Sequence, residues 1–168
     1  MRPTVATEAD VDTMVAIHQE ARETYYRGVV PPERLSADTD SLRAAYLDSV
    51  TDPRRTVLIV AGAGFVSLGP AFDPAVPPTV RQLVGLYVRP GDWGRGIGSA
   101  LHDAGIAEWR AAGVTTGHLE VWSGNERAAA FYARRGWRPD GHRREEYIRL
   151  TLTIPIRSSS GRMGSDEG

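Results

Sequence analysis

The sequence contains neither cysteine nor lysine. The absence of cysteine excludes disulfides, thiolate zinc sites and a cysteine nucleophile. All 20 basic residues are arginine, which excludes a P-loop lysine and a lysine Schiff base. No stretch approaches the ~20 apolar residues of a membrane span, and Glu8, Asp10 and Asp12 interrupt any signal-peptide core. We therefore expect a cytoplasmic protein that has no contact with a membrane.

Length and charge further narrow the class of protein. The chain has 168 residues, 41% hydrophobic and 24% charged, which is typical of one globular domain with a substantial core. A net charge of −1 and the lack of a basic cluster predict no binding to nucleic acid. His18, His102, His118 and His142 have no metal-ligand spacing. We expect each of them at the surface or hydrogen-bonded, and we predict no metal site.

One short glycine-rich loop stands out between a strand and a helix. Leu83–Val88 is an apolar run that predicts a buried strand, and Gly94, Gly96 and Gly98 precede a helical pattern. Glycine lets an anion approach the backbone, and the first N–H groups of a helix have no intrahelical partner. The spacing does not match the dinucleotide fingerprint Gly-x-Gly-x-x-Gly. The remaining candidate ligand is a pyrophosphate held by backbone amides, as in coenzyme A enzymes.

Periodicity and turn residues predict an alternation of strands and helices. The expected strands are 2–6, 56–61, 65–68, 83–88, 114–122, one that starts at 137, and 147–156. The expected helices run from a Thr7 cap to about 25, from Asp38 or Asp40 to Pro53, from the glycine loop to about 112, and from an Asn125 cap to 135. Helices on both faces of a sheet follow from this order.

Three segments together resemble the GNAT superfamily of N-acetyltransferases. Gly96 and Gly98 fill the two glycine positions of its Arg/Gln-x-x-Gly-x-Gly/Ala loop, whereas Trp93 stands where the family has Arg or Gln. The stretch 119–137 resembles the next family motif, and 2–14 resembles the family opening. The resemblance covers residues 2–156.

This resemblance implies a fold and a domain organisation. The expected fold class is α/β (α+β): a mixed, mostly antiparallel sheet of about seven strands flanked by helices and splayed between strands four and five. The expected domain spans 1–157, and the polar stretch 158–168 is predicted to be a disordered tail. A homodimer through the last strand is compatible with such a fold.

The resemblance also implies acetyl-CoA as co-substrate and assigns residues to it. Its pyrophosphate would lie on the loop residues Gly94, Arg95, Gly96, Ile97, Gly98 and Ser99. Its pantetheine would pair with the backbone of Leu86, Tyr87 and Val88, with the Val88 N–H as oxyanion donor, and would contact the Asn125 side chain. Tyr132, two helical turns after Asn125, would hydrogen-bond to the departing thiolate. Glu120 is either a general base or half of a structural salt bridge.

The acceptor is expected between the first two helices and the loop before the last strand. Tyr25, Tyr26 and Glu33 suit a cationic amine, whereas Arg143 and Arg144 suit an acid, so the sequence leaves the substrate open. The leading hypothesis is acetyl transfer to a primary amine of a small molecule or peptide. The alternatives are a non-catalytic acyl-CoA-binding sensor or regulatory module, and transfer of a longer acyl group.

Overall fold

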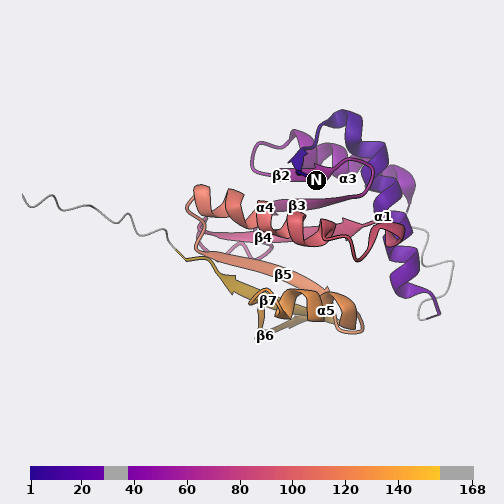
Figure 1. The fold of residues 1–168 in the computed structure, drawn as a ribbon. Coiled ribbons are helices and arrows are strands. Elements are labelled where there is room, and N and C mark those ends of the chain that lie inside the picture. Colours follow the sequence, from indigo (N-terminus) through magenta and orange to yellow (C-terminus); the bar gives the residue numbers. More distant parts are fainter. Residues whose placement is uncertain (29–37, 156–168) are drawn as a thin grey trace, which may run out of the picture.

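The computed structural model describes residues 1–28 and 38–155, which form a mixed sheet with helices on both faces (Figure 1). Its strands are β1 (Thr4–Val5), β2 (Thr56–Val60), β3 (Gly64–Pro70), β4 (Val80–Val88), β5 (Thr116–Trp122), β6 (Arg138–Arg144) and β7 (Tyr147–Thr153). Its α-helices are α1 (Val11–Tyr26), α3 (Thr39–Thr51), α4 (Ile97–Ala111) and α5 (Glu126–Ala133), and the 3-10 turns are η1 (Glu8–Asp10) and η2 (Pro90–Asp92).

The sheet is split in the middle, as predicted. The strand order is β1-β2-β3-β4-β5-β7-β6, and all neighbouring strands are antiparallel except β4 and β5. The parallel pairing of β4 with β5 is limited to 80–82 against 116–118. Beyond that point β4 stays paired with β3 and β5 with β7, so a gap opens between the two central strands.

Alternation along the strands sends side chains into two apolar clusters, one on each face of the sheet. Val57 and Ile59 of β2 pack with α1 and α3, together with Phe65. Leu58 and Val60 belong to the other cluster, which contains residues of α4 and α5. Each face of the sheet is therefore covered by its own helical layer, as Figure 1 shows for α4 on one side and α1 and α3 on the other.

Local signals placed most of the elements correctly. Thr7 N–H donates to the Asp10 carboxylate at 2.8 Å at the start of the first helical segment, and Asp38 accepts from Asp40 N–H at 3.1 Å at the start of α3. The expected strands 56–61 and 65–68 are present as the antiparallel pair β2 and β3, with Gly62 at φ +71° in the turn between them. These contacts satisfy backbone groups that a chain reversal or a helix start would otherwise leave unpaired.

Several boundaries differ from the prediction. β1 covers only 4–5 and β7 ends at Thr153, whereas β4 begins at Val80, three residues earlier than its apolar run. The early start includes Gln82, which is 1% exposed and accepts a hydrogen bond from Phe72 N–H at 3.2 Å. A buried glutamine interrupts the apolar pattern, so hydrophobicity alone did not detect this part of the strand.

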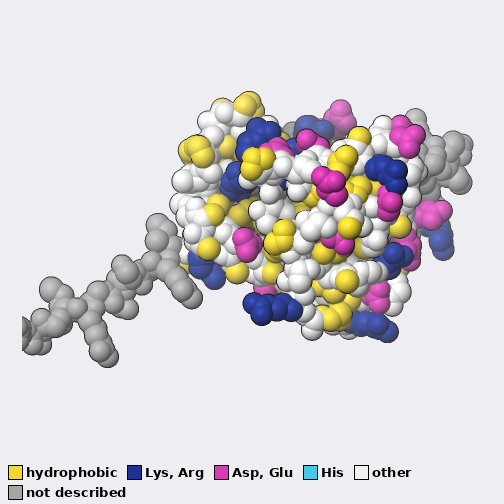
Figure 2. Space-filling view, turned by 90° about the horizontal axis from the view of Figure 1, so that it is seen from above, with side chains coloured by type: hydrophobic (Ala, Val, Ile, Leu, Met, Phe, Trp, Pro, Cys, Tyr) yellow, Lys and Arg dark blue, Asp and Glu magenta, His cyan; other side chains and the backbone are white. Residues whose placement is uncertain are grey.

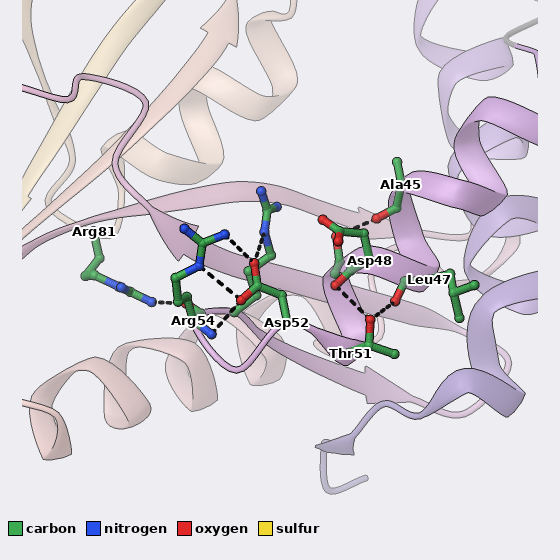
Figure 3. A network of polar contacts seen from close by, with 9 residues as sticks. Ala45, Leu47, Asp48, Thr51, Asp52, Arg54 and Arg81 are labelled. Atoms are coloured by element: carbon green, nitrogen blue, oxygen red, sulfur yellow. Dashed lines mark hydrogen bonds and ion pairs between the residues drawn. The ribbon is translucent and has the colours of Figure 1, made fainter.

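A polar network fixes the end of α3 against the beginning of β4 (Figure 3). Asp52 N–H donates to Asp48 O at 2.8 Å, and the Asp52 carboxylate accepts from the Arg54 guanidinium at 2.8 Å. Hydrogen bonds from Arg54 lower the pKa of Asp52 to about 2. Arg81 of β4 donates to the Arg54 carbonyl. The network therefore connects the loop before β2 to the part of β4 that pairs with β5.

The surface seen in Figure 2 carries arginine and acidic side chains close to one another, and neither sign forms a broad patch on that face. In the described residues, no helix is both long and apolar enough to cross a membrane. The same residues contain no group of three or more histidine, aspartate or glutamate side chains placed to hold a metal ion.

Candidate active site

The glycine-rich loop folds into a cradle at the start of α4. Gly94 and Gly96 have φ of +78° and +79°, a left-handed conformation that side-chain-bearing residues rarely adopt. Gly96 immediately precedes the helix, so the N–H groups of Ile97, Gly98 and Ser99 belong to its first turn. The partial positive charge of a helix N-terminus lies at this turn. An anion is therefore favoured at this end of the helix.

A pocket of about 260 Å³ opens in front of this turn. Its lining includes Gly94, Gly96, Ile97, Gly98 and Ser99 of the predicted set, Leu86 and Val88 of β4, and Arg127, Arg134 and Arg135 from α5 and its end. Arg95 of the predicted set is absent from the lining; its exposed guanidinium pairs at 3.2 Å with Asp92, which does line the pocket. This loop pocket, as we call it, combines free amides with arginines and suits a polyanionic ligand.

The backbone of β4 presents donors to the gap in the sheet. Arg89 N–H donates to Ala63 O of the β3 side at 2.8 Å, and Gly64 lies opposite Val88 in the register. Successive N–H groups of a strand point to opposite edges, so the Val88 and Leu86 N–H groups point away from β3. On that side β5 has already diverged. The gap can therefore receive an extended ligand that pairs with β4 as a strand would.

Trp93, the departure from the family loop, has a defined place. Its indole N–H donates to Val88 O at 3.0 Å, and its ring stacks on Tyr25 of α1 with centroids 5.4 Å apart. The guanidinium carbon of Arg127 lies 3.6 Å from the centre of the same ring. This Tyr25–Trp93–Arg127 stack connects α1, the loop and α5 at the edge of the loop pocket. The sequence had shown Trp93 only as a departure from the family loop and had indicated no partner for its side chain.

A second pocket, of about 370 Å³, is lined by both strands that border the gap, β4 and β5. We call it the inner pocket. It shares Tyr25, Leu86, Ala128 and Tyr132 with the loop pocket, so the two adjoin along these side chains. The other residues that line it come from α1, β4, β5 and the β6–β7 hairpin, together with Phe72 before β4 and Asn125 at the start of α5.

Tyr132 and Asn125 both line the inner pocket, as their spacing predicts. Tyr132 is 8% exposed and packs edge-on against Phe131 and Trp137. Burial raises the pKa of Tyr132 well above its ordinary value, so the phenol is protonated at neutral pH. The Asn125 side-chain oxygen caps α5 by accepting from Ala128 N–H at 3.1 Å.

Glu120 lies on β5 beside the same pocket and is engaged in an ion pair. Its carboxylate contacts the Arg144 guanidinium at 2.6 Å, and its side chain is 12% exposed. The structure therefore shows the salt bridge that the sequence left as one of two alternatives, and it places the acid-binding candidate Arg144 in that pair.

The α1 face of the inner pocket contains His18, Arg22, Tyr25 and Tyr26. Tyr25 and Tyr26 were predicted there, and Tyr26 packs on Trp122 with centroids 5.0 Å apart. Glu33, the third predicted pocket residue, and the predicted tail 158–168 lie outside the described residues. His18 and Arg22 were not among the predicted pocket residues. Their i, i+4 spacing with Tyr26 on one helix face is the signal that could have identified them.

His18 is held from two sides. Its ring stacks on Tyr87 of β4, with centroids 4.3 Å apart, and its Nδ1 lies 2.5 Å from the Tyr46 hydroxyl. Burial, with the charge of Arg22 as a second cause, lowers the pKa of His18 to about 4. The imidazole is therefore neutral at physiological pH.

A sheet split after one short parallel pairing, with an amide-lined pocket at its opening, is the arrangement that the resemblance to the N-acetyltransferase superfamily implies. The family described as acetyltransferase (GNAT) matches residues 14–137, and the chain belongs to this family. It is therefore an N-acetyltransferase. Uncharacterized N-acetyltransferases of Mycobacterium bovis and Mycobacterium tuberculosis strain H37Rv are each 30% identical over 143 residues, covering 80% of this chain and 86% of theirs.

Solved structures show the same fold at lower identity. A PaiA N-acetyltransferase from Thermoplasma acidophilum, in complex with coenzyme A, aligns with a TM-score of 0.77 and 15% identity, over 91% of this chain and 99% of its own. A ribosomal-protein-alanine N-acetyltransferase from Brucella melitensis aligns with a TM-score of 0.71 and 24% identity, over 92% and 100%. These likenesses confirm the predicted fold class.

Proposed function

We propose that this protein transfers the acetyl group of acetyl-CoA directly to a primary amine of a small molecule or peptide. The observation that carries the proposal is the pair of adjoining pockets, which meet at Tyr132 and Leu86. One pocket suits a polyanion, and the other combines aromatic and charged side chains. A donor in the first and an acceptor in the second would meet at the gap between β4 and β5.

The loop pocket is the proposed site of the coenzyme. The N–H groups from Gly94 to Ser99 would donate to the pyrophosphate oxygens, and hydrogen bonds to a charged acceptor contribute roughly 1.5–3 kcal/mol each. Arg134 and Arg135 line the same pocket and add positive charge. The coenzyme supplies an acetyl group activated as a thioester. Its pantetheine would run along Leu86, Tyr87 and Val88 and past Asn125.

The Val88 N–H is the proposed oxyanion donor. Its direction towards the gap is set by the β3–β4 register, so it is oriented before any ligand arrives. A preorganised donor of this kind contributes about 3–4 kcal/mol to a transition state that carries developing negative charge. The Trp93 indole holds the carbonyl of the same residue and thereby limits the movement of this peptide segment.

Tyr132 is the proposed partner of the departing thiolate. As the amine nitrogen bonds to the acetyl carbon, the carbon–sulfur bond breaks and the sulfur takes up a proton or a strong hydrogen bond. A buried, protonated phenol at the junction of the two pockets can donate that hydrogen bond, whereas burial raises its pKa and makes full proton transfer to the sulfur uphill, so the thiolate takes its proton from solvent. General acid catalysis of this kind contributes typically about 10²–10⁴-fold to the rate.

Glu120 is the proposed acceptor, through water, of the proton that the amine loses. The ordinary pKa of a carboxyl group lies about six units below that of an ammonium, so a direct transfer would be strongly uphill. A water relay, or an acceptor amine of low pKa, reduces this cost. Glu120→Gln should then shift the pH profile of kcat/KM to higher pH, whereas Glu126→Gln on the exposed start of α5 should leave it unchanged.

The experiment has a binding step and a turnover step. Thermal unfolding is followed with acetyl-CoA, with NAD and with ATP, and only acetyl-CoA should raise the midpoint. Free thiol release is then measured over a panel of amines for wild type and Tyr132→Phe. We expect kcat to fall about 100-fold in the variant with acetyl-CoA binding unchanged. Failure of acetyl-CoA to bind, or equal turnover of the variant at every pH, would overturn the respective assignment.

A further inference from the structure

The charges that line the inner pocket do not balance. They belong to Arg22, Glu120 and Arg144, and the last two neutralise each other at 2.6 Å. Arg22 has no ion-pair partner within residues 1–28 and 38–155. His18 beside it is neutral. The described part of the pocket therefore carries one uncompensated positive charge.

Arg22 projects from the middle of the α1 face of the pocket. It lies one turn after His18 and one turn before Tyr26, and its guanidinium carbon is 5.9 Å from the centre of the Tyr26 ring. Tyr87 of β4 lines the same pocket. Arg22 is half-buried in this pocket, which α1 and β4 both line.

The surroundings of Arg22 are mostly aromatic. Tyr25, Tyr26, Trp122 and Tyr147 line the same pocket, and their rings offer apolar surface with few acceptors. A guanidinium has five N–H donors in a planar fork that matches both oxygens of a carboxylate. Glu120, the acidic side chain in the described lining, is already paired with Arg144. Arg22 is therefore the charge that this lining leaves for a ligand, and its guanidinium suits a carboxylate.

We propose that the acceptor is a small amine that also carries a carboxylate, a free amino acid with an apolar or aromatic side chain, and that Arg22 binds its carboxylate. This inference rests on the proposed acetyl transfer and specifies its substrate class. The amine would face Tyr132 and the coenzyme, and the side chain of the acceptor would lie against the aromatic rings. A cavity of about 370 Å³ has room for such a molecule.

The test compares acceptors that differ only in the carboxylate. L-Phenylalanine and 2-phenylethylamine are assayed with acetyl-CoA, and kcat/KM is expressed per concentration of free amine, because the two amines differ in pKa. Wild type should prefer phenylalanine by about tenfold or more. Arg22→Gln should raise the KM for phenylalanine about tenfold, change that for 2-phenylethylamine less than about twofold, and leave kcat within about threefold. Arg22→Lys should recover part of the preference.

Controls separate this loss from a folding defect. Arg110→Gln removes an exposed arginine of α4 that lines none of the described pockets, and it should behave as wild type. Each variant must unfold at the wild-type temperature in the presence of acetyl-CoA. Equal kcat/KM for the two acceptors in wild type, or an unchanged preference in Arg22→Gln, would overturn the inference.

A binding measurement separates the inference from the proposed transfer. N-acetyl-L-phenylalanine and N-acetyl-2-phenylethylamine are titrated calorimetrically into the coenzyme A complex of wild type and Arg22→Gln. Tighter binding of the carboxylate compound that disappears in the variant supports Arg22 even if no amine is acetylated, in which case only the proposed transfer fails. Equal binding of the two compounds to wild type refutes the carboxylate site whatever the turnover.

Discussion

Replacing Gly96 by alanine tests the assignment of the glycine loop. Gly96 has φ +79°, and a Cβ built there meets no protein atom within 4 Å. The protein itself therefore experiences only backbone strain, of roughly 1–2 kcal/mol for a left-handed residue. For a chain of this size that lowers the unfolding midpoint by roughly 2–8 °C.

Gly113 is the matched control. It has φ +76°, also has no atom within 4 Å of a built Cβ, and lies beyond the end of α4 and outside the lining of the loop pocket. Gly113→Ala should lower the free energy of unfolding by the same amount as Gly96→Ala. Gly96 also lines the loop pocket, so the methyl group of alanine at this position would keep a phosphate from the backbone. The loss of one charge-assisted hydrogen bond, about 1.5–3 kcal/mol, corresponds to roughly 10–100-fold weaker binding of acetyl-CoA.

The assay is calorimetric titration of acetyl-CoA into both variants and wild type, at a temperature where all three are folded. We expect Gly113→Ala to bind as wild type does and Gly96→Ala to bind at least about tenfold more weakly. If both variants lose stability equally and both bind acetyl-CoA normally, the loop is not the pyrophosphate site. Equal weakening in both would show that strain alone explains the effect.

Three further predictions concern the surroundings of the site. A double-mutant cycle of Trp93→Ala and Arg127→Gln in urea unfolding should give a coupling of about 0.5–1 kcal/mol, and zero coupling would contradict the observed stack. The free energy of unfolding should fall as the pH drops from about 6.5 to about 4, because His18 is protonated in this range in the unfolded chain but not in the folded one. The loss should be of the order of 2–3 kcal/mol, and it should be smaller in His18→Phe. Gly117→Ala should cost roughly 1–3 kcal/mol because its Cβ would lie 2.5 Å from Trp109, whereas Gly91→Ala, in open space, should be nearly neutral in the same unfolding assay.

Local features of the sequence determined the order of the helices and strands and the residues of the loop pocket, the proposed site of the coenzyme. Glycine spacing, the apolar run before it and the Asn125 cap are properties of short segments, because backbone sterics and unpaired helix-end groups act within a few residues. The same holds for Asn125 and Tyr132, whose two-turn spacing on one helix brings both to the inner pocket. The sequence pattern missed the first residues of β4, because they include Gln82, a polar residue that is buried and accepts a hydrogen bond from the distant Phe72 N–H.

The acceptor side was decided by the tertiary structure. The packing of α1 across β4 places His18 on Tyr87 and brings Arg22 to the pocket, and no period in the sequence records the angle at which a helix crosses a sheet. The pairing of Glu120 with Arg144 likewise depends on the register between β5, β7 and β6. Sequence periodicity reports which face of an element is buried, whereas the partner on that face is set by contacts between distant segments.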